Sequence, residues 1–204
     1  MNPLGSLAGR LASEGVNYAP AIASAAAKHG VDPTLLAAVA AQETGGPGAN
    51  GGRNELGDGG HGHGLFQIDD RWHDFANSAA AMDPAENADY AAGMLSGLLR
   101  RYGGNVREAL SAYNSGSPTG KGTSTTWSDG QTLDYADSVF RHYRQLGQST
   151  PQVFARPSIC APPSAPLAHH HPHRWRSAEG IDATGHSSSQ SMSYDTYING
   201  GDNP

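Results

Sequence analysis

One glutamate and a group of aspartates in the first third of the chain have the residue types needed for acid–base chemistry. Glu43 lies four residues after Val39, seven after Leu36 and eight after Leu35, so helical periodicity places its carboxyl group on an apolar helix face, near the helix end. Burial there would disfavour the ionised form and raise the pKa, as a general acid working near neutral pH requires. Periodicity alone also allows the side chain to reach solvent at the helix end.

The aspartates lie in the glycine-rich stretch GDGGHGHGLFQIDD, residues 57–70. Asp58 lies in a glycine turn, and Asp69 and Asp70 follow a short apolar run. Glycines allow positive φ angles and a close approach of the backbone to a bulky ligand. An acid that faces loop-borne carboxylates is the arrangement of an inverting glycosidase, in which one group protonates the leaving oxygen and the others position a water. Each aspartate could instead serve only as a turn or capping residue.

Helices are predicted before and after this stretch. Asp32 and Asp83 are good N-cap residues, each followed by a proline at the first helical position, and Gly147 ends the last amphipathic segment. Apolar residues recur at helical spacing after Asp83, which indicates a buried helix. The predicted helices cover residues 18–30, 31–46, 83–103, 105–116 and 132–147.

The segments between and after the helices have a different composition. Residues 45–64 are dominated by Gly, Asn and Asp, which indicates loops or a short hairpin, and we expect HGLFQID, residues 63–69, to form a strand. Beyond Gly147 the chain is rich in Pro, Ser and His and has no apolar periodicity. We therefore predict a mainly α domain over residues 1–147 and a disordered C-terminal tail over 148–204.

The composition excludes several classes of function. The chain has 204 residues and a formal net charge of −6 with scattered Lys and Arg, so we expect no nucleic-acid partner. No stretch approaches the roughly 18 apolar residues of a membrane helix, so we expect no membrane insertion. The N-terminus lacks the apolar region of a secretory signal peptide. The single Cys160 cannot form an internal disulfide.

Four phrases identify a resemblance to a known family. Taken in chain order, the four sequence segments given at the end of this paragraph resemble segments of the goose-type lysozymes and of their relatives, the soluble lytic transglycosylases. The resemblance extends over roughly residues 30–147. The resemblance implies a lysozyme-like α+β fold with a helical core and a small β-hairpin or Gly-rich loop beside the active-site cleft. It also implies a peptidoglycan substrate, cleaved between N-acetylmuramic acid and N-acetylglucosamine. The phrases are VDPTLLAAVAAQETGG, GDGGHGHGLFQIDDRWH, ALSAYNSG and DYADSVFRHYRQLG.

The resemblance also assigns roles to individual residues. Glu43 matches the glutamate that protonates the glycosidic oxygen, Asp69 matches the aspartate that holds the attacking water, and Asp58 matches a second aspartate near it. Substrate binding is assigned to residues around this acid and these aspartates. They are Tyr113, Asn114, Gln67, His73, Tyr135 and His63.

The departures from the family patterns bear on the nucleophile. In transglycosylases a serine-glycine turn and a methionine-glutamine run usually follow the glutamate, whereas here LFQIDDRWH keeps Asp69 where goose-type lysozymes have theirs. This favours water over the sugar's own 6-hydroxyl group, and thus an inverting lysozyme. The alternative enzyme is a lytic transglycosylase, in which Glu43 acts as acid and then as base and the product is a 1,6-anhydro sugar. A third alternative is a non-catalytic module that binds cell walls or builds a virion.

The expected cofactors and partners follow from the same residues. The pair His61 and His63 could bind zinc only with a third ligand, and the family match offers no metal, so we expect no metal and no cofactor. The partner we expect is the glycan strand of peptidoglycan, bound by a monomer. We expect action in the periplasm or cell wall after release by lysis with a holin, injection by a secretion system, or delivery in a virion.

Overall fold

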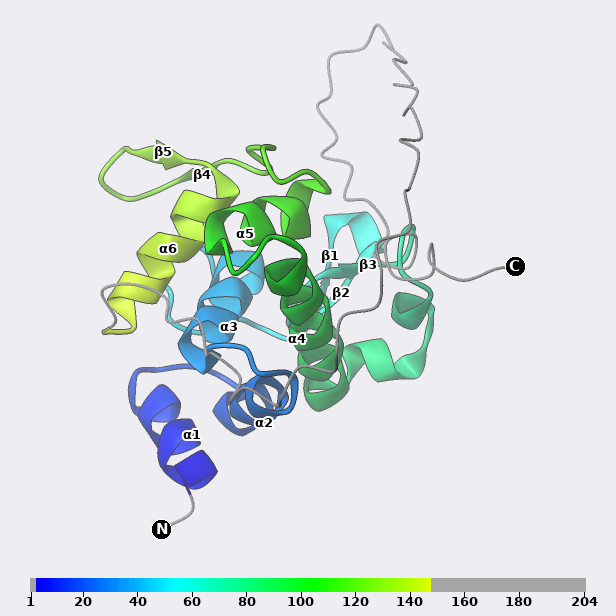
Figure 1. Cartoon of the computed structure of the whole chain (residues 1–204), viewed down its shortest axis with the longest axis vertical. Helices are drawn as coiled ribbons and strands as arrows, with labels where there is room; N and C mark the ends of the chain where they lie inside the picture. The colour runs from blue at the N-terminus through cyan, green and yellow to red at the C-terminus, as the bar shows by residue number, and fades with distance from the viewer. Residues whose placement is uncertain (1–2, 148–204) are drawn as a thin grey trace, which may run out of the picture. The chain divides into compact units, whose positions relative to one another are not determined.

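The computed structural model describes residues 3–147, and the predicted tail at 148–204 lies outside the described residues. Figure 1 shows the arrangement of its helices and two small antiparallel sheets. The predicted mainly α fold, with a helical core and small antiparallel sheets, is therefore confirmed. The helices are α1 (Pro3–Ser13), α2 (Ala19–His29), α3 (Pro33–Ala40), α4 (Pro84–Arg101), α5 (Val106–Ser115) and α6 (Tyr135–Gln145).

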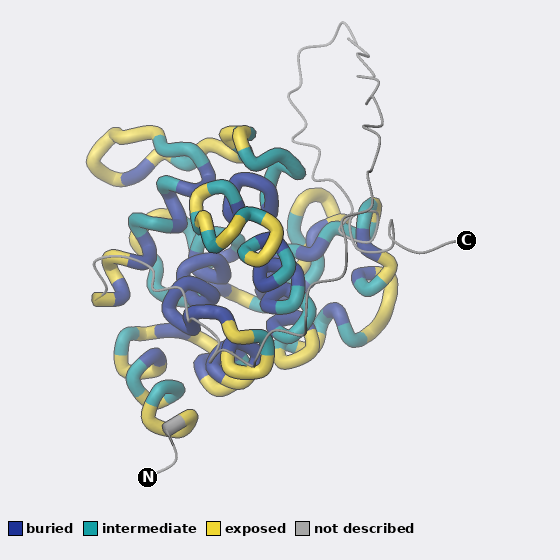
Figure 2. The backbone as a smooth tube through the Cα atoms, viewed as in Figure 1, coloured by how far each residue is buried: buried dark blue, intermediate teal, exposed yellow. Residues whose placement is uncertain are grey.

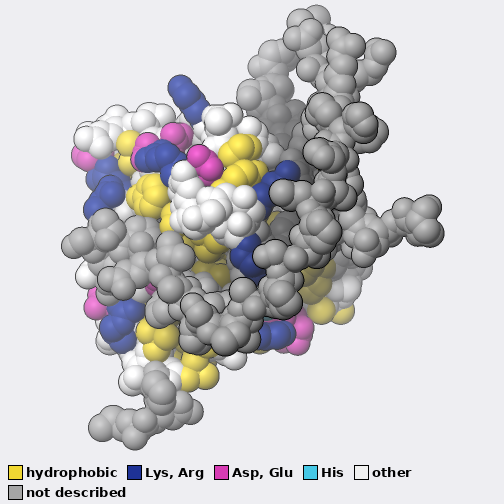
Figure 3. All heavy atoms as spheres, viewed as in Figure 1, with side chains coloured by type: hydrophobic (Ala, Val, Ile, Leu, Met, Phe, Trp, Pro, Cys, Tyr) yellow, Lys and Arg dark blue, Asp and Glu magenta, His cyan; other side chains and the backbone are white. Residues whose placement is uncertain are grey.

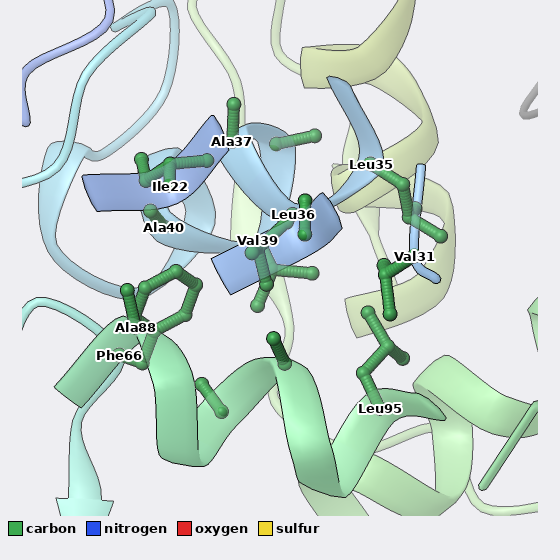
Figure 4. Close-up of a cluster of buried hydrophobic side chains, with 14 of the residues drawn as sticks. Ile22, Val31, Leu35, Leu36, Ala37, Val39, Ala40, Phe66, Ala88 and Leu95 are labelled. Carbon is green, nitrogen blue, oxygen red and sulfur yellow. The ribbon is translucent and has the colours of Figure 1, made fainter. Parts of the chain in front are cut away.

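Helix α3 forms the centre of the core, because all eight of its residues are buried. A helix that is apolar on every side needs neighbours on every side. Figure 4 shows side chains of α3 beside Ile22 of α2, Leu95 of α4, and Phe66 from the turn between residues 64 and 68. Figure 2 shows the same buried centre surrounded by exposed loops. The rigid, dehydrated α3 thus supports the segment that follows it, which contains Glu43.

The helix ends lie where the capping signals predict them. Asp32 accepts a hydrogen bond from the backbone N–H of Thr34 at 2.8 Å, and Asp83 accepts from two backbone N–H groups of the first turn of α4. Gly116, with φ 71°, ends α5 in the left-handed conformation. Helix α1 was not predicted, because its sequence contains two glycines and lacks an N-cap signal. It nevertheless packs on the core, since its Leu11 is fully buried.

The glycine-rich stretch forms a three-stranded antiparallel sheet, of order β1 (Glu55–Gly57), β2 (Gly62–Gly64) and β3 (Ile68–Asp69). A hairpin was one of the two predicted forms and is confirmed, but the single strand predicted over residues 63–69 is wrong. Gln67 has a φ of 48°, so the chain turns over residues 65–67 and the segment divides between β2 and β3.

The remaining described elements are short. A π-helix, η1 (Ala41–Gly45), continues α3, and 3₁₀ turns cover η2 (Asp58–Gly60), η3 (Asp74–Asn77) and η4 (Ala79–Met82). A second hairpin, β4 (Thr125–Thr126) with β5 (Thr132–Leu133), lies before α6 and was not predicted.

The surface of the described domain mixes charges of both signs. In the face drawn in Figure 3, Lys and Arg side chains lie among Asp and Glu side chains. Within residues 3–147, none of the helices combines the length and the apolar character that crossing a membrane requires.

Candidate active site

Glu43 lies on the π-helical turn η1, directly after the buried helix α3. A π-helical turn inside a longer helix is rare and occurs often at functional sites. The side chain of Glu43 is partly exposed, and its Oε1 accepts a hydrogen bond of 2.5 Å from the hydroxyl of Tyr135. Burial of the carboxyl group raises its pKa to about 7, although the Tyr135 hydrogen bond lowers it. Near neutral pH this carboxyl group is therefore both a proton donor and a proton acceptor.

Thr44, the residue after Glu43, joins η1 to the glycine-rich sheet. Its Oγ1 lies 3.1 Å from the carbonyl oxygen of Leu65 and accepts a hydrogen bond of 2.9 Å from the backbone N–H of Arg53. The backbone at Gly52 passes so close that a Cβ there would lie 2.4 Å from the carbonyl oxygen of Ala40. Only glycine fits at this position, so the sheet and the Glu43 turn are held in close contact.

Two tyrosines from different helices border the carboxyl group of Glu43. Tyr135 begins α6, and its ring stacks on that of Tyr113 from α5 with centroids 6.4 Å apart. Burial, followed by the charge of Glu43, raises the pKa of both hydroxyls well above the usual value, so both stay protonated. The Tyr113 hydroxyl is buried and has no hydrogen-bond partner among the described residues. It is a free donor beside Glu43.

The aspartates of the glycine-rich stretch lie in a polar environment. Asp69 accepts hydrogen bonds from Arg71: the backbone N–H at 2.8 Å, Nε at 2.9 and 3.1 Å to the two oxygens, and Nη2 at 2.6 Å. Nη2 also donates to Asp58 Oδ2. Burial acts to raise the pKa of Asp69, but the hydrogen bonds and charge of Arg71 outweigh burial and lower it. Asp69 is therefore ionised at neutral pH.

Asp70, next in sequence, belongs to a separate cluster. Its carboxylate accepts hydrogen bonds from His61 Nδ1 at 2.8 Å and from His63 Nε2 at 3.2 Å, and the His61 bond is the largest cause of its lowered pKa. His63 is thus paired with Asp70. No group of three His, Cys, Asp or Glu side chains suited to a metal ion occurs within residues 3–147.

The other residues assigned to substrate binding make contacts within the protein. Gln67 Nε2 donates to the carbonyl oxygens of Glu55 and Gly64 and so braces the sheet. His73 is 4% exposed, with Nδ1 3.1 Å from the hydroxyl of Tyr90. Asn114 Oδ1 accepts from the backbone N–H of Thr123 at 2.8 Å. Their assignment to sugar binding stays a prediction.

Arg71 is the residue of this site that the sequence reasoning missed. It lies two residues after Asp69, in IDDRWH, and a cation at that spacing beside a carboxylate was a signal available in the sequence. Its second partner, Asp58, lies 13 residues away and comes close only because β1, β2 and β3 pair. The carboxylates therefore form one unit with a shared cation.

Comparison with protein families gives a match that covers most of this site. The family model described as Transglycosylase SLT domain matches residues 20–129, more than half of the chain. The matched range contains Glu43, Asp58, Asp69 and Tyr113, whereas Tyr135 lies beyond it. The four elements that carry the first four residues are therefore those of the matched domain.

Proposed function

This chain belongs to the transglycosylase SLT domain family of peptidoglycan-cleaving enzymes, and on that premise we propose that it hydrolyses the glycan strand. The bond is the β-1,4 link between N-acetylmuramic acid and N-acetylglucosamine, and the mechanism is inverting, as in goose-type lysozymes. The observation that carries this proposal is the pair of opposite pKa shifts. Glu43 has a pKa of about 7, and Asp69 has a lowered pKa. Carboxyl groups whose surroundings push their pKa values apart divide into an acid and a base.

In the proposed mechanism Glu43 protonates the glycosidic oxygen while the bond from this oxygen to C1 breaks. The tyrosine hydroxyls beside Glu43 remain neutral, and Tyr135 stabilises the carboxylate that forms by donating its hydrogen bond. A water held by the Asp58–Asp69 unit attacks C1 from the opposite face of the ring, and its proton passes to that carboxylate unit. The product carries a free reducing end on N-acetylmuramic acid.

A lytic transglycosylase is the second candidate, and the description of the matched family favours it. In that reaction the muramic acid 6-hydroxyl attacks C1, and Glu43 donates a proton to the leaving oxygen and then accepts the hydroxyl proton. A pKa of about 7 suits both steps. This reaction needs no second carboxylate, so the Asp58–Asp69 unit favours hydrolysis.

Mass spectrometry of the soluble muropeptides released from purified peptidoglycan tests the choice. Hydrolysis gives reducing ends, whereas transglycosylation gives products lighter by one water. Glu43→Gln keeps the oxygen that accepts from Tyr135 and removes the transferable proton, so we expect turnover to fall at least about 1,000-fold. Near-normal activity of this variant would refute the role of Glu43. No products from folded wild-type protein would instead support the non-catalytic wall-binding module.

The route by which the enzyme reaches the cell wall remains a prediction. The net charge of −6 would slow free diffusion onto an acidic wall, which favours delivery by a secretion system or virion. Adding the purified protein to intact cells from outside, with and without permeabilisation, tests this: delivery-dependent action predicts lysis only of permeabilised cells.

A further inference from the structure

Arg71 holds both aspartates of the proposed water site, and it does so asymmetrically. Asp69 is 15% exposed, and each of its oxygens accepts hydrogen bonds from Arg71. Asp58 is 63% exposed and uses only Oδ2 for Arg71. Within residues 3–147 its Oδ1 has no hydrogen-bond donor. The less exposed carboxylate, Asp69, is thus the anchor, and the more exposed Asp58 keeps an oxygen available to a ligand.

Two carboxylates at one site repel each other unless a cation lies between them. Asp58 lies on a glycine turn with a φ of 47°, a strained conformation for this residue, and its exposed side chain has no other ion-pair partner among the described residues. Without Arg71, both repulsion and side-chain freedom would move Asp58 away from Asp69. The planar guanidinium is suited to prevent this, because its donors have fixed directions.

We infer that Arg71 is a positioning residue that selects water over the muramic acid 6-hydroxyl as the nucleophile, by holding Asp58 Oδ1 beside Asp69. This inference rests on the proposed hydrolysis. Hydrolysis requires an immobilised water, whereas the 6-hydroxyl is already attached to the reacting sugar. Loss of the clamp therefore slows attack by water and leaves the intramolecular reaction at Glu43 intact.

Arg53 provides a matched control on the same sheet. Its Nε and Nη2 donate to Glu55 at 3.0 and 3.1 Å, so it also pairs with a carboxylate two residues away and is exposed. Among the described residues, Glu55 forms its ion pair with Arg53 and neither a hydrogen bond nor an ion pair with Arg71. Arg53→Gln thus removes an ion pair of the same kind without touching the Asp58–Asp69 unit.

The experiment compares wild type, Arg71→Gln, Arg71→Lys and Arg53→Gln by the ratio of reducing-end to anhydro muropeptides and by kcat/KM. For Arg71→Gln we expect hydrolysis to fall about 100-fold, and the share of anhydro products to rise at least tenfold. Arg71→Lys should lie between, because an ammonium keeps the charge without the paired donors. Arg53→Gln should stay within twofold of wild type.

Three outcomes would overturn the inference. The first is a wild-type product ratio for both Arg71 variants, and the second is an equal shift caused by Arg53→Gln. A wild-type enzyme that forms only anhydro products is the third, and it refutes the proposed hydrolysis as well. A hydrolytic wild type with unchanged Arg71 variants refutes the role of Arg71 alone. Thermal unfolding of each variant checks its fold, and Arg71→Lys carries the test if Arg71→Gln does not fold.

Discussion

Two regions of the site hold the same functional group in opposite surroundings. At the end of α3, Glu43 receives a hydrogen bond from the neutral phenol of Tyr135 and, within residues 3–147, forms no ion pair. On the glycine-rich sheet, Asp69 receives several hydrogen bonds from the cationic Arg71. The first carboxyl group has a pKa near 7, and the second has a lowered pKa.

The difference shows how one fold prepares an acid and an anion within a short chain segment. The helical core reduces the hydration of the Glu43 carboxyl group, and the phenol of Tyr135 compensates only part of the lost hydration. On the small sheet, Asp69 keeps 15% of its side chain exposed and bonds to the guanidinium of Arg71, whose hydrogen bonds and charge keep it ionised. The type of donor and the depth of burial, rather than the residue type, determine the protonation state.

The largest effect is expected from a substitution that removes the negative charge of Asp69. Asp69→Asn should lower hydrolysis by about 1,000-fold, because the amide neither pairs with Arg71 nor accepts the water proton. Asp70→Asn is the control: Asp70 pairs with His61 and His63 rather than Arg71, and we expect less than a threefold change. Initial rates of muropeptide release measure both. Equal losses for the two variants would show that the unit containing Asp69 has no special role.

The second prediction uses the stability of the folded chain to test the burial of Glu43. Its folded pKa, about 7, exceeds the ordinary glutamate pKa of 4.5, so the folded state binds more protons than the unfolded state between these values. The wild type should therefore lose stability as pH rises through this window, and Glu43→Gln should not. By 1.4 kcal/mol per pKa unit, the free energy of unfolding of Glu43→Gln relative to wild type should rise by at most about 3.5 kcal/mol from pH 4 to pH 9.

Urea unfolding of both proteins at the two pH values measures this gain. The difference between the proteins matters, since Asp69 and the other titrating groups contribute equally to both. Parallel stability curves from pH 4 to pH 9 would show that Glu43 is hydrated like an ordinary surface glutamate. In that case the surroundings of Glu43 and Asp69 would not shift the two pKa values in opposite directions.

The smallest expected effect concerns the hydrogen bond from Tyr135. This bond lowers the pKa of Glu43, so Tyr135→Phe should raise that pKa and move the alkaline limb of kcat/KM upward by about one pH unit. Tyr113→Phe is the control, because the Tyr113 hydroxyl has no hydrogen bond to lose among the described residues. A pH–rate profile of each variant gives the limb. A downward shift for Tyr135→Phe would contradict the assigned direction.

Much of the helical fold was predictable because its signals are local. Asp32 with Pro33, and Asp83 with Pro84, mark helix starts through bonds within one turn, and Gly116 marks an end through its own φ angle. The apolar spacing before Glu43 allowed either a buried carboxyl group or one that reaches solvent, and in the structure the side chain is partly buried, with a raised pKa caused mainly by burial. Such patterns depend only on residues within a turn or two of each other, so they can be recognised in the sequence.

Contacts between distant segments were beyond the reach of local patterns. The partner that adjusts Glu43, Tyr135, lies 92 residues later, and pairing of Arg71 with Asp58 depends on the register of three short strands. The expected strand breaks at Gln67, which has a φ of 48° and whose side chain donates to the carbonyl oxygen of Glu55, a contact that periodicity does not encode. The chain's own pattern thus determined the helices and indicated Glu43 as the candidate acid. Long-range packing decided the protonation partners, since hydration and charge depend on what folds against a residue.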